Sequence, residues 1–123
     1  MAFNPFDMNI FILHLLLCAF LPNAPEPTPP KVFNVHNFGA TGDGKTLCTV
    51  SIQSAIDQCA AAGGGRVYVP EGRFLTGSLR MKSGVELRLS KKAVLLGSTR
   101  HADYGKNNWY ALILAHGQRD ISI

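Results

Sequence analysis

The segment GATGDGKT, which begins at Gly39 and ends at Thr46, is the chain's closest match to a chemical motif. It satisfies the phosphate-loop pattern G-x-x-x-x-G-K-[ST], which lies between a strand and a helix in nucleotide-binding proteins. In such a loop, backbone N–H groups hold the phosphates, Lys45 would contact the outer phosphates and Thr46 would contact Mg²⁺.

The surrounding sequence opposes a nucleotide site. The strand that feeds a phosphate loop is normally buried on both faces, whereas this one carries Asn34 and His36. The helix pattern begins only near Thr49, and Asp43 would place a carboxylate beside the phosphates. No later apolar strand runs into an aspartate that could hold Mg²⁺. We therefore interpret this segment as a Gly/Asp turn and keep a nucleotide binder as a remote alternative.

Carboxylates could also act as a general acid and a general base, provided that two of them face one substrate bond. Four aspartates lie in predicted turns or on the polar side of the predicted helix, with no paired carboxylate nearby in sequence: Asp43, Asp57, Asp103 and Asp120. We assign none of them a catalytic role. We also interpret His116 as a turn or core residue.

The cysteines are spaced for neither a disulfide nor a metal site. Cys48 and Cys59 flank or occupy one predicted helix, which places them ~16 Å apart along its axis. A disulfide needs Cα atoms within about 7 Å, so we expect no bond between them. There is no Cys-x-x-Cys and no His/Cys cluster at metal-ligand spacing, and we expect no metal and no cofactor.

The chain has 123 residues, of which 46% are hydrophobic and 16% charged, a composition typical of a globular domain. Residues 10–21 (IFILHLLLCAFL) are too short to span a bilayer of ~30 Å and fit the apolar core of an export signal, although no Lys or Arg precedes them. We interpret residues 1–21 as signal-like and residues 22–30, with five prolines, as a linker. We expect an exported protein whose folded part spans residues 31–123.

The folded part is basic. All twelve Lys and Arg residues lie from Lys31 onward, against six acidic residues there, which gives this part a net charge of about +6. A basic exported surface suits a polyanion such as an acidic polysaccharide or a nucleic acid, but a generic solvated surface fits the scattered charges equally well.

One helix precedes a series of short strands. Residues 49–62 (TVSIQSAIDQCAAA) place Ile52, Ala55, Ile56 and Cys59 on one helical face, and Gly63 supplies a helix end. Strand patterns follow at 66–70, 73–82, 85–90 and 93–98, and again at 121–123. We expect six of their side chains to face the core: Leu75, Leu79, Val85, Leu87, Leu89 and Val94.

The short turns between these strands leave no room for the helices of a doubly wound fold. An antiparallel sandwich, a barrel and a solenoid remain, and periodicity alone does not choose among them.

Four segments together resemble glycoside hydrolase family 28, the polygalacturonase family within the pectate-lyase-like superfamily. They are FGATGDGKT (38–46), IQSAIDQCAAAGGGRVYVPEGRF (52–74), MKSGVELRLSKKAVLLGS (81–98) and DYGKNNWYALILAHGQRDISI (103–123). The resemblance implies a right-handed parallel β-helix whose open end is covered by the helix at 49–62. It also implies that residues 31–123 are the N-terminal, truncated part of such a domain.

The implied activity is inverting acid/base hydrolysis of galacturonide linkages in pectin. The family's motifs Asn-x-Asp, Asp-Asp and Gly-His-Gly do not occur here, so we expect the catalytic coils to be missing from this chain and the chain alone to be inactive. Two alternatives stay open: a pectate-lyase-type enzyme, which would need Ca²⁺, and a noncatalytic glycan-binding β-helix module.

The polar loop at residues 101–110 could contact substrate through three aromatic residues, Tyr104, Trp109 and Tyr110. The alternative is that these rings pack against the cap or the first coil. The expected partner of the full-length protein is an acidic polysaccharide, pectin or polygalacturonate. We expect no nucleic-acid partner, no stable membrane span and a monomer.

Overall fold

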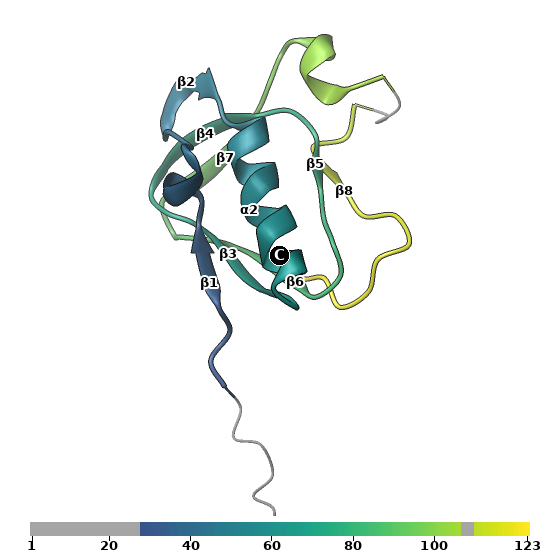
Figure 1. Ribbon diagram of the computed structural model, residues 1–123. Coiled ribbons are helices and arrows are strands. Elements are labelled where there is room, and N and C mark those ends of the chain that lie inside the picture. Colours follow the sequence, from purple (N-terminus) through teal and green to yellow (C-terminus); the bar gives the residue numbers. More distant parts are fainter. Residues whose placement is uncertain (1–27, 107–109) are drawn as a thin grey trace, which may run out of the picture.

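The computed structural model describes residues 28–106 and 110–123, so the signal-like segment and most of the predicted linker lie outside the described residues. The elements follow one another around a coil (Figure 1). In order they are β1 (Val32–Asn34), the 3₁₀ helix η1 (Val35–Phe38), β2 (Asp43–Leu47), α2 (Thr49–Ala61), β3 (Gly65–Val69), β4 (Gly72–Thr76), β5 (Leu79–Arg80), β6 (Val85–Leu89), β7 (Ala93–Gly97), the 3₁₀ helix η2 (His101–Tyr104) and β8 (Ile113–Leu114).

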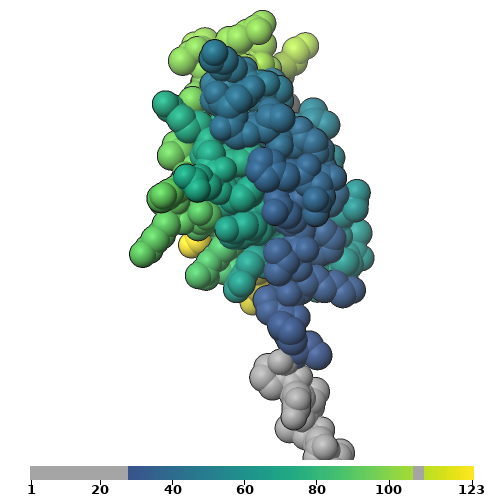
Figure 2. All heavy atoms as spheres, turned by 90° about the vertical axis from the view of Figure 1, so that its left-hand side faces the viewer, coloured from purple at the N-terminus to yellow at the C-terminus, as the bar shows by residue number. Residues whose placement is uncertain are grey.

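The strands form three parallel sheets, in the orders β1-β3-β6, β2-β4-β7 and β5-β8. The second and third turns of the coil therefore each add one strand to each sheet, whereas the first turn adds a strand to the first two sheets. A further bridge joins Ser122 to Glu86 in the first sheet. Figure 2 shows successive turns side by side, as bands of blue, teal and green. This arrangement is a parallel β-helix, and the parallel pairing rules out the antiparallel sandwich.

Helix α2 occupies the place of a strand in the first turn of the coil. The chain passes through the first sheet as β1 and the second as β2, and it returns to the first sheet as β3 only after the helix. The predicted apolar face is fully buried, at Ile52, Ala55, Ile56 and Cys59, and Figure 1 shows the helix lying over the space that the strands enclose. Within the described ranges, no helix is both long and apolar enough to cross a membrane.

The polar side of α2 supplies hydrogen bonds that a neighbouring strand would otherwise make. Three residues at i, i+4 and i+8 line this side: Thr49, Gln53 and Asp57. Thr49 Oγ1 accepts a bond from the N–H of Gly77 (2.7 Å). The Gln53 carboxamide accepts from the N–H of Arg80 (2.8 Å) and donates to the Arg80 carbonyl (3.0 Å). Asp57 pairs with Lys82 (2.8 Å). The amide of Gln53 thus pairs with β5 on the edge that β8 does not cover.

The predicted core is confirmed in β5 and β6, where Leu79, Val85 and Leu87 are fully buried and Leu89 packs against them partly buried. The predictions for Leu75 and Val94 are wrong. Phe74 and Thr76 face inward on β4, while Leu75 is partly exposed and Val94 is 45% exposed.

The error arises at a corner of the coil. At Gly77 the chain leaves the second sheet for the third, so the alternation that holds on β5 cannot be carried back to Leu75. In the β4–β7 ladder Phe74 pairs with Leu95, which therefore shares its inward face and leaves Val94 outside.

The predicted Gly/Asp turn is only partly correct, because Asp43–Leu47 forms β2. Two flanking bonds hold this strand on β4, from Arg73 N to the Gly42 carbonyl (3.1 Å) and from Cys48 N to the Leu75 carbonyl (2.7 Å). Between them the pairing is irregular, and the turn survives there as a local distortion.

Both described cysteines, Cys48 and Cys59, are buried and free, as expected from their spacing.

Candidate functional site

The loop between β7 and β8 carries the predicted substrate-contact residues, and Tyr104 at the end of η2 anchors it. The Tyr104 hydroxyl donates to the Ser98 carbonyl (2.6 Å). It also passes close above the backbone of Gly97, where a Cβ atom would lie 2.9 Å from the hydroxyl oxygen. The side chain is half-buried and packs on the end of β7, not on the cap or the first coil, and its contact with substrate stays a prediction.

The base of this loop rests on the corner between β4 and β5. The Ser78 hydroxyl lies within hydrogen-bond distance of the carbonyls of Tyr104 (3.1 Å) and Ala111 (2.6 Å), and the Ser98 hydroxyl bonds the Asp103 carboxylate. A Cβ atom on Gly77 would lie 1.8 Å from the Asp103 carbonyl oxygen, so no side chain fits there. The two described ends of the loop, at residues 103–104 and at Ala111, therefore rest on the preceding turn of the coil.

Among the described residues of the loop, Tyr110 is an exposed aromatic residue. It is 65% exposed and adopts a positive φ of 55°. Its ring stands edge-on to His101 (centroids 4.8 Å apart) and to Tyr104 (6.4 Å). Trp109 lies outside the described residues. Tyr110 and His101 thus offer a small aromatic surface near η2, at the upper right of Figure 1.

A groove of about 440 Å³ runs beside α2, between the helix and the β5 segment. Its polar lining is used internally, because Gln53 bonds the Arg80 backbone and Asp57 pairs with Lys82. Burial tends to raise the pKa of Asp57, but hydrogen bonds from Lys82 and Gln53 outweigh it and lower the pKa. The polar groups of this groove therefore join α2 to β5 and are not arranged as a reactive centre.

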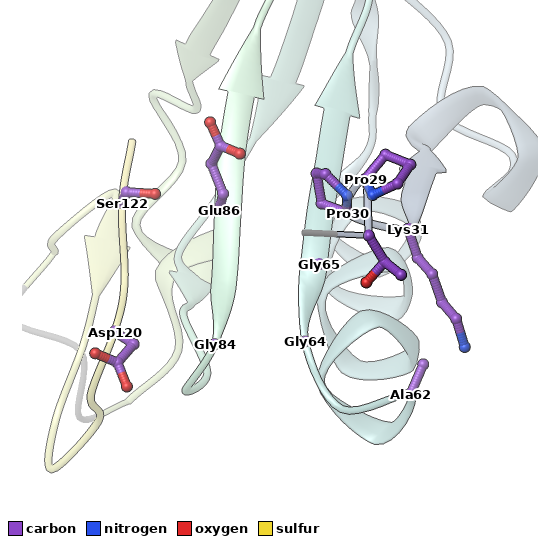
Figure 3. A pocket seen from close by; sticks show the side chains of 11 residues that line it. Pro29, Pro30, Lys31, Ala62, Gly64, Gly65, Gly84, Glu86, Asp120 and Ser122 are labelled. Carbon is purple, nitrogen blue, oxygen red and sulfur yellow. The ribbon is translucent and has the colours of Figure 1, made fainter. Parts of the chain in front are cut away.

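A second hollow, of about 640 Å³, lies where the strands of the first sheet begin (Figure 3). Backbone of Gly65 and Gly84 borders it, and Glu86 projects from β6 beside Ser122 of the next turn. Asp120 adds a second carboxylate. No group of three or more His, Cys, Asp or Glu that could hold a metal is found in residues 28–106 and 110–123.

The outer face of the first sheet carries polar residues that the sequence analysis did not single out. The ladder register aligns Asn34, Tyr68 and Arg88 in one row, and Arg66 beside Glu86 in the next. Their signal was the alternation in RVYV and VELRL, which predicted the inward residues and left these outside.

None of the carboxyl groups with a shifted pKa is suited to be a general acid, which needs a raised pKa to stay protonated. Backbone N–H groups of Thr46 and Lys45 lower the pKa of Asp43 to about 2. The hydrogen bond from Arg66 lowers the pKa of Glu86, and the pKa of Asp57 is lowered as described. His116 lies exposed in a bend, in agreement with its interpretation as a turn residue.

In the segment that matches the phosphate-loop pattern, Asp43 already accepts the hydrogen bonds that a phosphate would need. Asp43 Oδ1 accepts bonds from the N–H groups of Lys45 (2.9 Å) and Thr46 (2.8 Å), and Oδ2 accepts from the Thr46 hydroxyl (2.7 Å). Backbone N–H groups and a hydroxyl are what a nucleotide and its Mg²⁺ would need. The structure thus opposes the remote nucleotide-binding alternative.

Comparison with known proteins places these features in a family. A sequence model for a family described as rhamnogalacturonase A/epimerase, pectate lyase-like, matches residues 32–98. An exo-poly-α-D-galacturonosidase from Dickeya chrysanthemi is 52% identical over 75 residues, which are 61% of this chain and 12% of that protein. A mannuronan C5-epimerase from Azotobacter vinelandii is 46% identical over 66 residues, 47% of this chain and 5% of the epimerase.

Among solved structures, the family 28 exopolygalacturonase of Yersinia enterocolitica superposes with a TM-score of 0.66 at 37% identity, covering 76% of this chain and 19% of the enzyme. This chain therefore spans a small part of the length of the proteins it matches. The comparisons confirm the resemblance to polygalacturonases and the right-handed parallel β-helix.

Proposed function

This chain belongs to the rhamnogalacturonase A/epimerase, pectate lyase-like family, and on that premise we propose that it forms the capped first turns of a polygalacturonase-like glycoside hydrolase of family 28. The observation that carries the proposal is the 52% identity to the Dickeya galacturonosidase, which is higher than the 46% identity to the epimerase. The substrate class is a polymer of galacturonic acid, and the reaction is hydrolysis of its glycosidic bonds.

The described residues contribute support and orientation to such an enzyme. Helix α2 closes the end of the coil, and the Gln53 and Thr49 bonds hold the third sheet against it. A scaffold of this kind lets later turns of a solenoid present catalytic groups on rigid strands. The net charge of about +6 on the folded part favours a polymer with one carboxylate on each sugar.

Product analysis tests this proposal. The protein expressed from its complete coding frame is incubated with polygalacturonate, and we expect new reducing ends without unsaturated sugars. Unsaturated products, lost when a chelator removes Ca²⁺, would instead identify a lyase. Binding without any new product would support the noncatalytic glycan-binding module and overturn the hydrolase proposal.

An epimerase of uronic acid polymers is the second candidate, because the Azotobacter relative is a mannuronan C5-epimerase by name. Epimerisation changes the configuration at C5 without cutting the chain. An unchanged polymer length with altered sugar signals in NMR would therefore favour it over hydrolysis.

The exposed ring of Tyr110 supports a role in substrate contact, because aromatic rings can cover the apolar face of a sugar. We expect Tyr110→Ala to weaken binding of oligogalacturonate and Tyr110→Phe to retain it. Equal binding by both variants and the unmodified protein would remove Tyr110 from the site.

We also propose that the protein is exported and monomeric. A polymeric substrate outside the cell and the signal-like segment at residues 1–21 support export. N-terminal sequencing of the mature protein tests the first statement, and sedimentation of the purified protein tests the second. A mature protein that retains residues 1–21 in the cytoplasm would contradict export.

A further inference from the structure

The outer face of sheet β1-β3-β6 places an aromatic ring among guanidinium groups. Tyr68 on β3 pairs in register with Asn34 on one side and with Arg88 on the other. Arg66 precedes Tyr68 by two residues on the same strand and therefore lies on the same face. Neighbours across the ladder are ~4.8 Å apart and neighbours along the strand are about 6.6 Å apart, so these residues form one surface.

Glu86 holds the two arginines. Its carboxylate accepts a bond from Arg66 Nε (2.7 Å) and lies 3.6 Å from Arg88 Nη1. The three side chains carry a net charge of +1. A guanidinium has five N–H donors, and Glu86 engages only part of each set. The Arg88 side chain is 60% exposed and the Arg66 side chain 33% exposed, so donors remain accessible to a ligand.

We propose that this face is a second binding surface for an acidic polysaccharide, in which Tyr68 contacts a sugar ring while Arg88 and Arg66 bind uronate carboxylates. We name it the Tyr68 surface: Asn34, Arg66, Tyr68, Glu86 and Arg88. It lies on a different sheet from the strands β7 and β8 that carry the loop with Tyr110. This inference rests on the substrate class proposed above, but the Tyr68 surface is not required for hydrolysis itself.

The chemistry of the Tyr68 surface matches a uronic acid polymer in two respects. A uronate unit offers both a planar carboxylate, which a guanidinium binds through paired hydrogen bonds, and a ring face, which an aromatic side chain can cover. The ladder spacing of ~4.8 Å is also close to the length of a pyranose ring, so successive sugars can meet successive strands.

A nucleic acid fits the Tyr68 surface less well. Glu86 lies within it, and Asp120 lines the hollow beside Glu86, so a densely charged phosphate chain would meet two carboxylates. With a net charge of only +1 on the arginine–glutamate group, the surface favours a polymer whose charges are spread over uncharged hydroxyl groups.

Binding of a defined oligogalacturonate to the full 123-residue chain, measured by calorimetry at fixed low salt, tests the proposal. We expect Arg88→Ala to raise Kd about tenfold, the loss of one charge-assisted hydrogen-bonded contact. Arg73→Ala is the matched control, because Arg73 is exposed on the outer face of a different sheet and its loss removes the same charge. We expect it to change Kd by less than about twofold.

The Glu86→Gln variant distinguishes ligand binding at this surface from a purely structural role of the Arg66–Glu86–Arg88 ion pairs. The substitution removes the carboxylate that competes with the ligand, so we expect Kd to fall while Arg88→Ala makes it rise. A ladder that only stabilises the sheet would leave Kd unchanged in both variants. NMR would locate the contact. We expect chemical-shift changes at residues 66, 68 and 88 when the oligomer is added, and none when its methyl-esterified form is added.

Three possible results would each decide a different part of the proposal. Unchanged Kd in both variants overturns the Tyr68 surface, even if the protein hydrolyses polygalacturonate. Equal weakening by Arg88→Ala and Arg73→Ala, with a DNA oligomer bound as tightly, also overturns it and indicates nonspecific charge attraction. The expected variant pattern with oligomannuronate but not with oligogalacturonate supports the surface and contradicts the proposed substrate.

Discussion

Replacement of Gln53 by alanine tests whether a side-chain amide takes the place of a strand at the edge of β5. The substitution removes two hydrogen bonds to the backbone of Arg80, at its N–H (2.8 Å) and its carbonyl (3.0 Å), and one to the Asp57 carboxylate (3.0 Å). Each bond contributes ~0.5–1.5 kcal/mol net. Arg80 is exposed and water can replace part of the loss, so we expect a decrease of about 1 kcal/mol in the free energy of unfolding.

The assay is thermal unfolding followed by far-ultraviolet circular dichroism. For a domain of this size, ~1 kcal/mol corresponds to a fall in Tm of about 4–8 °C. Gln58→Ala is the matched control, because Gln58 is an exposed glutamine on the same helix. Both substitutions change helix propensity equally, so the difference between them reports the side-chain bonds of Gln53 to Arg80 and Asp57. Equal Tm values for the two variants would refute the reasoning.

The remaining predictions concern the loop, a turn and a thiol. Gly77→Ala should lower Tm and shift the NMR signals of the β7–β8 loop, because the new Cβ would lie 1.8 Å from the Asp103 carbonyl oxygen; an unchanged loop spectrum would contradict this packing. The Asp43 carboxyl should titrate near pH 2 by NMR, so the turn it holds is stable above its ordinary pKa of 3.8 and opens as the pH falls toward 2; a midpoint near 3.8 would show that the turn bonds are absent. Burial raises the pKa of the Cys59 thiol, so a thiol reagent should modify it only on unfolding, and rapid modification of the folded protein would contradict its burial.

The sequence predicted those elements whose pattern is local. Helix α2 follows from apolar residues at helical spacing, and the inward face of β6 follows from the alternation in VELRL. The inward face of β4 could not be predicted in the same way, because Phe74 and Leu75 are adjacent and both apolar. Which of them enters the core depends on the corner at Gly77, and that corner depends on contacts with distant residues.

The candidate site was less predictable for the same reason. The aromatic residues near residue 104 were visible in sequence, but the roles of two of them depend on partners that only the fold supplies. Ser78 contacts the carbonyl of Ala111, 33 residues away, and thereby fixes the base of the loop. Tyr104 is committed to Ser98, whereas Tyr110 remains exposed.

Helix α2, at the start of the coil, also affects how readily the protein aggregates. An exposed strand edge can recruit a strand from another molecule and start a fibre. In the third sheet the edge of β5 meets the Gln53 amide on α2, and a side chain on a helix cannot extend a backbone ladder. In the other two sheets the first strands are poor templates, since β1 has three residues and β2 is distorted at Asp43. This end of the molecule should therefore resist intermolecular strand addition, and substitutions that loosen α2 should promote fibre formation before they abolish the fold.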